Sequence, residues 1–261
     1  MIQSGLPAAV EVNDLTVCFA GVVLAVERAS LQLRPGEFVS IIGPSGCGKT
    51  TILNTLAGLL PVQSGQVSLC GRPPRLGNPD VAYMLARDSL LPWRTALGNA
   101  CYGMEIRGVP ERERLQRGRD LLERVGLGHF CDNYPKELSH GMRQRCALAR
   151  TFCLDSPVLL MDEPFGSLDA QTKLQLEDLL LSLCAEESRT VVFITHDLAE
   201  AVAMSDRVIV MTPRPGRIVA DIAIDLPRPR TVRQMQTDKL FHSYYARLWE
   251  LLEQGMEAGH G

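Results

Sequence analysis

Polar and apolar residues alternate over much of the first forty positions, a pattern that is typical of β-strands. The alternation covers residues 10–12, 15–17 and 30–33, and a turn at residues 34–37 follows it. Residues 38–42 are apolar at all but one position, which predicts a strand that is buried on both faces. The N-terminal part therefore predicts several strands, the last of them fully buried.

Helical and strand patterns follow one another beyond this point. Five apolar residues at helical spacing predict a helix directly after the buried strand: Ile52, Leu53, Leu56, Leu59 and Leu60. Further strands are predicted at residues 158–161, 191–195 and 208–211, and helical segments at residues 174–183 and 198–204 separate them. This succession predicts an α/β core.

A helical segment interrupts the core. Residues 97–150 contain charge-dense helical stretches and almost no strand pattern. We therefore expect one folding unit at residues 8–230, with a helical insertion at about residues 88–155.

A Pro-Arg-Pro-Arg run at residues 227–230 marks a boundary, and we expect a C-terminal helical tail at residues 231–261. One stripe of this tail is aromatic or aliphatic and comprises Phe241, Tyr244, Tyr245, Leu248, Leu251 and Leu252. The tail has too few basic residues for a membrane anchor, so we expect the stripe to pack on the core or on a partner.

Composition narrows the classes of function. The chain has 261 residues, 46% of them hydrophobic, and its net charge of −3 disfavours a nucleic-acid binder that is held by phosphate contacts. No apolar run approaches the roughly 18 residues that cross a bilayer, and the first residues lack a secretory signal, so we expect an intracellular location. The eight cysteines form no C-x-x-C pair, which argues against a zinc site or a redox dithiol.

The strongest chemical motif is a glycine-rich loop directly after the predicted buried strand. It matches the pattern G-x-x-x-x-G-K-[ST], and glycines let its backbone N–H groups point at phosphates in front of a helix N-terminus. Lys49 would reach the β- and γ-phosphates, and the hydroxyl of Thr50 would ligate Mg²⁺. The predicted nucleotide-binding residues are Gly43, Pro44, Ser45, Gly46, Cys47, Gly48, Lys49, Thr50 and Thr51.

Cys47 has two possible interpretations. A thiol at a helix N-terminus can have a lowered pKa and become reactive. The alternative, which we favour, is that this position contributes only its backbone N–H group to the loop.

Two adjacent carboxylates end the predicted strand at residues 158–161. Neighbouring side chains on a strand point in different directions, so Asp162 and Glu163 suit two different tasks. Asp162 is predicted to hold the Mg²⁺ shell, and Glu163 to orient or deprotonate the attacking water.

Several further motifs resemble those of ATP-binding cassette (ABC) ATPases. The run Leu-Ser-His-Gly-Met-Arg-Gln-Arg at residues 138–145 is similar to the signature motif of that family. Residues 167–169 resemble its D-loop, and His196 resembles its switch histidine. Residues 90–95, 133–139 and 211–217 resemble segments of the ATPase subunits of bacterial nitrate, sulfonate and taurine importers.

The resemblance implies a fold and a set of site residues. The fold would be a phosphate-loop NTPase core of the RecA-like kind, with an antiparallel β subdomain and an inserted α-helical subdomain. Such cassettes work as dimers, in which the signature of one subunit meets the γ-phosphate bound by the other. The implied signature residues are Ser139, His140, Gly141 and Met142, and the implied D-loop residues are Ser167, Leu168 and Asp169.

An aromatic residue ahead of the phosphate loop, Phe19, resembles the residue that stacks on adenine. The alternative for Phe19 is plain packing in the core. For His196 the alternative is a core histidine without a catalytic role, although its place at a strand end favours the switch histidine.

The function that the resemblance implies is ATP hydrolysis coupled to uptake of a small anion such as nitrate, a sulfonate or taurine. Glu163 would be the general base, His196 would position the γ-phosphate, and ATP and Mg²⁺ would bind. The implied partners are a second ATPase subunit, transmembrane permease subunits contacted near Trp93, and indirectly a periplasmic solute-binding protein. The implied location is the cytoplasmic face of the bacterial inner membrane, as a peripheral subunit.

The sequence departs from the family pattern at two positions. Ala86 replaces a glutamine that touches Mg²⁺ and water, and a methyl group can do neither. Three interpretations stay open: water takes the place of the amide, Asp88 supplies a carboxylate, or the subunit is a weak ATPase in an asymmetric dimer. His140 replaces a glycine of the signature, and we expect little effect because Ser139 and Gly141 remain.

Two other functions stay open. One is an attenuated or regulatory nucleotide-binding subunit of a heterodimeric ABC complex, which Ala86 keeps open. The other is a non-transport ABC ATPase acting on DNA or ribosomes, although the short insertion and the slightly acidic balance argue against it.

Overall fold

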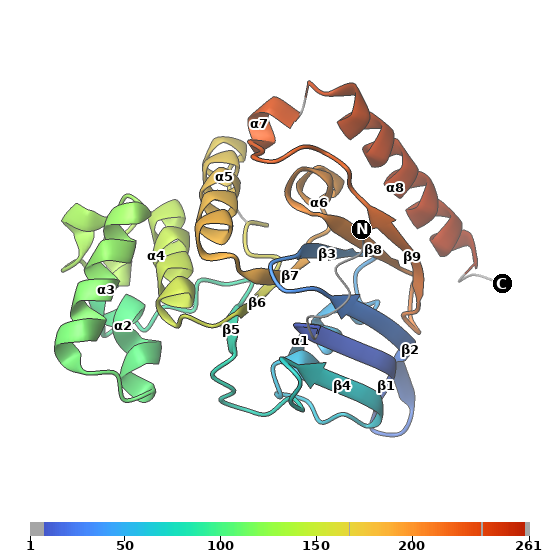
Figure 1. Ribbon diagram of the computed structural model, residues 1–261, viewed down its shortest axis with the longest axis horizontal. Coiled ribbons are helices and arrows are strands. Elements are labelled where there is room, and N and C mark those ends of the chain that lie inside the picture. The colour runs from blue at the N-terminus through green and yellow to red at the C-terminus, as the bar shows by residue number, and fades with distance from the viewer. Residues whose placement is uncertain (1–7, 167, 236, 259–261) are drawn as a thin grey trace.

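The computed structural model describes residues 8–166, 168–235 and 237–258. Within these residues the strands form two sheets (Figure 1). The smaller sheet is antiparallel, in the order β2-β1-β4. Its strands are β1 (Val10–Phe19), β2 (Val23–Leu33) and β4 (Ser64–Leu69).

The larger sheet has the order β5-β6-β7-β3-β8-β9 and is parallel except for the antiparallel pair of β8 and β9. Its strands are β3 (Phe38–Ile42), β5 (Val81–Met84), β6 (Val158–Asp162), β7 (Thr190–Ile194), β8 (Arg207–Met211) and β9 (Ile218–Ala223). Because β3, β6 and β7 are parallel neighbours, their C-terminal ends meet at one edge of the sheet. The segments that follow these three strands therefore lie close together.

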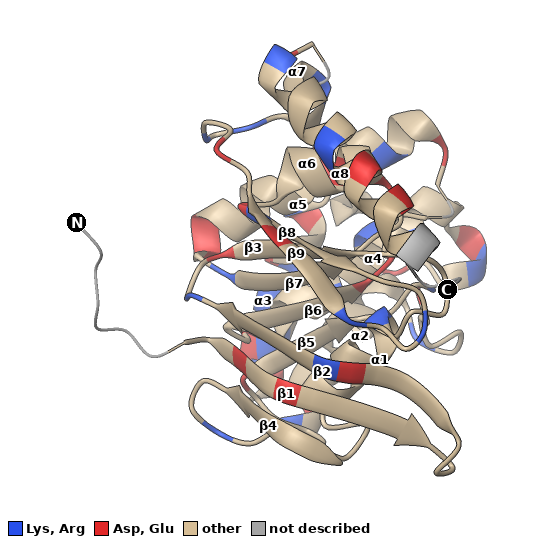
Figure 2. Cartoon of the chain, turned by 90° about the vertical axis from the view of Figure 1, so that its right-hand side faces the viewer, with Lys and Arg blue, Asp and Glu red and all other residues tan. Residues whose placement is uncertain are grey.

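Both faces of the larger sheet are covered, as the almost uninterrupted apolar strands require. Along β6, Val158 and Leu160 pack toward α1 (Lys49–Leu56) and the smaller sheet, whereas Leu159 and Met161 belong to the other core cluster. That second face carries α5 (Ala170–Glu187) and α6 (Leu198–Met204). Figure 2 shows the small sheet on one side of the large sheet and α5 and α6 on the other.

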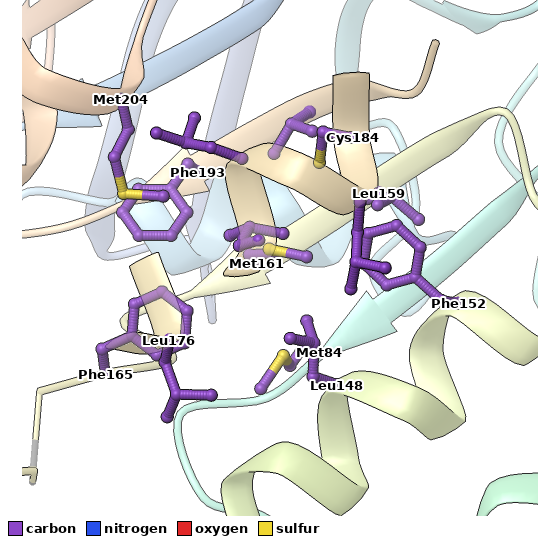
Figure 3. Close-up of a cluster of buried hydrophobic side chains, with 14 of the residues drawn as sticks. Met84, Leu148, Phe152, Leu159, Met161, Phe165, Leu176, Cys184, Phe193 and Met204 are labelled. Carbon is purple, nitrogen blue, oxygen red and sulfur yellow. The ribbon is translucent and has the colours of Figure 1, made fainter. Parts of the chain in front are cut away.

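Three helices lie between β5 and β6 in the chain: α2 (Ala96–Ile106), α3 (Glu111–Arg124) and α4 (His140–Cys153). Two 3₁₀ turns, Gly128–Phe130 and Pro135–Glu137, connect α3 to α4. Leu148 and Phe152 of α4 pack beside Met84 and Leu159, as Figure 3 shows, so α4 joins these helices to the sheet.

The C-terminal part contains α7 (Val232–Met235) and α8 (Lys239–Ala258). The helix α8 packs against α6 and β8, and Phe241 and Leu248 of its apolar stripe are buried. The stripe thus covers the core. None of the helices in the described ranges is both long and apolar enough to cross a membrane. The predicted α/β fold with an antiparallel β subdomain and inserted helices is confirmed.

Candidate active site

The glycine-rich loop joins β3 to α1 and is packed too tightly for larger residues. Gly48 has a φ of 101°, and a Cβ atom there would lie 2.7 Å from Val26 Cγ2 and 2.9 Å from the Ala25 carbonyl oxygen. Gly43 is buried, and its Cβ would lie 2.9 Å from the Met211 carbonyl oxygen. Only glycine fits these two positions, so the loop follows one path over the start of α1.

Lys49, the first residue of α1, places its ammonium group inside the loop. Its side chain is buried, and Nζ donates to the carbonyl oxygens of Gly43 at 2.8 Å and Pro44 at 3.1 Å. A buried ammonium held by backbone carbonyls is a fixed positive charge at the start of a helix, where anions are also attracted by the helix dipole.

Cys47 is fully buried in the same loop, with its Sγ 3.8 Å from the Lys49 ammonium. Burial raises the pKa of the Cys47 thiol, although the nearby Lys49 works in the opposite direction. A buried thiol with a raised pKa is a weak nucleophile. Of the two interpretations of Cys47, the geometry therefore favours a contribution of its backbone alone.

Next to Lys49, the side chains of Thr50 and Asp162 contact each other. Thr50 Oγ1 donates to Asp162 Oδ1 at 3.2 Å, across the gap between α1 and the end of β6. Burial raises the pKa of the half-buried Asp162, and the Thr50 hydrogen bond lowers it in part. Burial therefore disfavours the ionised form of Asp162, and the Asp162 carboxylate lies beside the Thr50 hydroxyl. Hard oxygen donors of this kind are the ligands that Mg²⁺ prefers, so the residues present fit the ion.

Glu163 and His196 form the adjacent pair. His196 Nδ1 lies 3.0 Å from Glu163 Oε2, and both side chains reach solvent. Glu163 has a φ of 45°, which is unusual for a residue other than glycine, and its N–H donates to the Ile194 carbonyl oxygen at 3.0 Å. Strained backbone of this kind concentrates at functional sites, and Glu163 lines the cleft over the phosphate loop.

The loop that carries His196 is fixed by polar contacts on both sides. Asp197 caps α6 by accepting the Ala199 N–H at 2.8 Å, and it pairs with Lys173 Nζ at 2.6 Å. Lys173 also lies 2.8 Å from Glu200 Oε1, and Thr195 Oγ1 donates to the same Glu200 carboxylate. The flanks of His196 are therefore tied to both α5 and α6.

A cleft of about 290 Å³ opens over the loop. The residues that line it are Phe19, Val23, Ala25, Ser45, Gly46, Cys47, Gly48, Lys49, Thr50, Thr51, Glu163 and Arg214. Phe19 is 40% exposed and so does not pack in the core, contrary to that alternative. Gly43 and Pro44 do not line the cleft, because their carbonyls face Lys49 instead.

Three lining residues were not predicted from the sequence, the apolar Val23 and Ala25 of β2 and the charged Arg214. Arg214 lies in the segment at residues 211–217, which resembles a segment of the importer subunits. No local motif points to Arg214, since the packing of distant segments places it in the cleft.

The signature residues lie elsewhere, at the start of α4. Ser139 caps this helix by accepting the Met142 N–H at 3.3 Å, and His140 Nδ1 lies 3.3 Å from Arg143. A Cβ at Gly141 would lie 2.7 Å from Thr172 Cγ2, so α4 starts close to the start of α5. None of the four signature residues lines the cleft.

The D-loop residues precede α5. Leu168 packs half-buried against the core, and Asp169 caps α5 by accepting the Thr172 N–H at 3.0 Å. This hydrogen bond lowers the pKa of the exposed Asp169. Ser167, the first predicted D-loop residue, lies outside the described residues.

Ala86 follows β5 by two residues and is exposed. Met84 of β5 is paired with Met161 of β6, so the chain leaves β5 beside the strand end that carries Asp162. Asp88 does not face this site, because its carboxylate pairs with Arg143 at 2.9 Å and accepts the Leu90 N–H. A role for Asp88 in place of the missing amide would require both contacts to break.

Comparisons of the sequence and of the fold both match this chain to ABC proteins. Residues 26–166 match the sequence family described as ABC transporter. The chain is 44% identical over 223 residues to an uncharacterized ABC transporter ATP-binding protein of Methanocaldococcus jannaschii, with 84% of each chain covered. It is 42% identical over 222 residues to the taurine import ATP-binding protein of Rhizobium johnstonii, which covers 84% of this chain and 85% of the relative.

A nitrate import ATP-binding protein of Synechococcus elongatus is 39% identical over 242 residues, or 91% of this chain and 37% of the relative. Among solved structures, a dimeric ATP-binding cassette in a post-hydrolysis state with ADP and Pi is 28% identical. It superposes with a TM-score of 0.73 over 84% of this chain and 100% of the other. The chain therefore belongs to the ABC transporter family and is one of its ATPases.

Proposed function

We propose that this chain is the ATP-hydrolysing subunit of an importer that takes up a small anion such as nitrate, a sulfonate or taurine. The observation that carries the proposal is the meeting of Lys49, the Thr50–Asp162 pair and the Glu163–His196 pair at one edge of the sheet. The importer class is supported by relatives that are named for taurine and nitrate import.

Phosphate binding falls to the loop and to Lys49. The backbone N–H groups of the loop and the buried Lys49 ammonium stabilise the negative charge of the β- and γ-phosphates. Phe19, which also lines the cleft, offers an aromatic face on which adenine stacks. Thr50 and Asp162 would hold Mg²⁺, which neutralises charge on the phosphate oxygens when it is bound.

Hydrolysis needs a water that is oriented and deprotonated. Glu163 accepts a proton from the water, the water oxygen attacks the γ-phosphorus, and the bond to the ADP oxygen breaks. His196, held 3.0 Å from Glu163, positions the γ-phosphate from the next strand end. The anchoring of its neighbours Thr195 and Asp197 keeps this ring in place.

The site is completed by a second copy of an ATPase subunit. Ser139 and Gly141 stand at the N-terminus of a 14-residue helix, away from the cleft of their own chain. A helix N-terminus attracts anions, so in a dimer these residues would meet the γ-phosphate bound by the partner. Homodimer and heterodimer both satisfy this geometry.

The permease would dock beside the inserted helices. Trp93 is 71% exposed, and an apolar groove of about 280 Å³ between α1 and α2 is lined by the exposed side chains of Leu59, Leu76 and Ile106. Exposed apolar surface of this kind marks interaction sites. We place the subunit at the cytoplasmic face of the membrane, with a periplasmic solute-binding protein as an indirect partner.

Replacement of Glu163 tests the proposed reaction. Glu163→Gln keeps the shape of the side chain but removes the base, so phosphate release should fall by at least about 100-fold. Binding of MgATP should stay within about threefold of wild type, because the phosphate loop is intact. Glu253→Gln, an exposed change on α8, is the matched control.

A Glu163→Gln variant that releases phosphate at the wild-type rate would remove Glu163 from the reaction. The substrate class is tested separately, by ATP-dependent uptake of labelled taurine, nitrate or an alkanesulfonate into vesicles that contain the assembled transporter. Failure of all three anions to accumulate would contradict the proposed substrate class while leaving the ATPase assignment intact.

A further inference from the structure

The segment at residues 212–217, which we name the β8–β9 loop, is a closed and anchored hairpin. The Thr212 N–H donates to the Arg217 carbonyl oxygen at 3.0 Å, and the Arg217 N–H donates to Thr212 Oγ1 at 3.0 Å. On its outer side, Arg217 pairs with Glu27 of β2 at 2.8 Å. The loop is therefore fixed at its base and along one flank.

The β8–β9 loop also packs directly against the phosphate loop. A Cβ atom at Gly216 would lie 1.8 Å from the Cys47 carbonyl oxygen, so the two backbones are in contact. Gly216 further donates its N–H to the Ala25 carbonyl oxygen at 3.0 Å, and Ala25 lines the cleft. Glycine at position 216 allows this close approach.

Arg214, at the tip of the β8–β9 loop, lines the cleft and is exposed. Two prolines, Pro213 and Pro215, flank it and limit the backbone conformations that it can adopt. Within the described part of the chain, Arg214 has no ion-pair or hydrogen-bond partner, whereas Arg217 of the same loop pairs with Glu27. Arg214 therefore carries a guanidinium group at the edge of the cleft that no acidic side chain of the described residues neutralises.

The charges that line the cleft show what this guanidinium would bind. Lys49 and Arg214 are its two cations, and Glu163 is its one acid. Lys49 is buried at the base of the phosphate loop, and Arg214 is exposed. A guanidinium presents paired N–H donors that match the oxygens of a phosphate group.

We propose that Arg214 binds the phosphate chain of the nucleotide from the rim of the cleft, as a second cation beside Lys49. This inference rests on the proposed function, since it adds a residue to the same nucleotide site. The β8–β9 loop therefore serves two purposes: Gly216 supports the phosphate loop from behind, and Arg214 contacts the ligand.

Binding titrations of MgATP and of inorganic tripolyphosphate to the purified chain test the proposal. Arg214→Ala should weaken the binding of both ligands about tenfold, because a charge-assisted hydrogen bond to phosphate is lost. Arg214→Lys should recover part of the loss, since it keeps the charge without the paired donors. Arg233→Ala removes an equal charge from an exposed position on α7, outside the cleft, and should leave both affinities within about twofold.

Three other outcomes would contradict either the role of Arg214 or the proposed function. Wild-type affinity for MgATP in Arg214→Ala, together with loss of binding in Lys49→Ala, would contradict the role of Arg214 and leave the proposed function standing. Weaker MgATP binding with unchanged tripolyphosphate binding would assign Arg214 to the base or ribose and contradict the phosphate contact. Absence of MgATP binding by the wild-type chain would overturn the proposed function itself. Because Arg214 is exposed and unpaired, its replacement should leave the melting temperature unchanged.

Discussion

At the position where the family pattern has a glutamine, this chain presents a methyl group to solvent. Ala86 is exposed beside the strand end of Asp162, so water has access to the place that an amide would occupy. Asp88 is held by Arg143 and by the Leu90 N–H, which leaves ordered water as the replacement that the geometry favours.

Ala86→Gln tests this interpretation. If water already bridges the gap, the added amide should change the turnover number for phosphate release by less than about threefold. Asp88→Asn is the companion variant, and it should act only on stability, through the Arg143 ion pair. A gain of tenfold or more in Ala86→Gln would instead support a naturally attenuated subunit in an asymmetric dimer.

The residues of the site differ in how far the sequence could predict them. Lys49, Thr50, Asp162 and Glu163 stand in short motifs whose chemistry depends on adjacent positions in the chain. Arg214 could not be found in this way, because it reaches the cleft through the packing of residues that are far apart in sequence.

Between α5 and α6 lies a buried polar cluster that supports the loop of His196. Glu177 is almost fully buried, and burial raises the pKa of its carboxyl group well above the ordinary value. The neighbouring Glu200 carboxyl raises this pKa further, whereas Lys173 lowers it and Asp197 raises it slightly. Glu177 is therefore protonated in the folded protein at pH values where it is ionised in the unfolded chain.

Glu177→Gln should make the stability of the protein less dependent on pH. Above the unfolded pKa of about 4.3, Glu177 takes up a proton when the wild-type chain folds. The free energy of unfolding of the wild type therefore falls as the pH rises toward the raised pKa of Glu177 in the folded protein. Glutamine cannot ionise, so between about pH 5 and about pH 8 the free energy of unfolding of the variant should rise relative to that of wild type, by up to about 1.4 kcal/mol for each pH unit.

Denaturant unfolding at both pH values measures this difference, with Glu253→Gln on the exposed face of α8 as the control. Parallel pH profiles for wild type and Glu177→Gln would show that Glu177 is ionised in the folded protein, contrary to the account.

Among the elements, the buried strands of the larger sheet were predictable, whereas the edge strands β4 and β9 were not. The apolar runs of β3, β6, β7 and β8 stand out because both faces of these strands are covered. By contrast, β4 and β9 lie at sheet edges, and most of their residues are half or fully exposed, so their sequences carry little apolar pattern.

For the whole molecule, the proposed site shared between subunits requires that one chain hold two half-sites. The phosphate loop lies in the cleft between the sheets, whereas the signature lies at the start of α4 on the inserted helices. The central claim is that a complete site needs the phosphate loop of one subunit and the signature of another.

Two variants separate these halves. Lys49→Ala disables the phosphate loop. Ser139→Asp keeps a good helix cap but places a negative charge against the γ-phosphate of the partner, while binding of MgATP to its own loop should stay unchanged.

The most direct test measures phosphate release by the Lys49→Ala and Ser139→Asp variants, each alone and in an equal mixture. Each variant alone should be nearly inactive. The mixture should recover about a quarter of the wild-type rate, because half of the dimers are mixed and each of these has one intact site. A mixture no more active than its components would contradict a site shared between subunits.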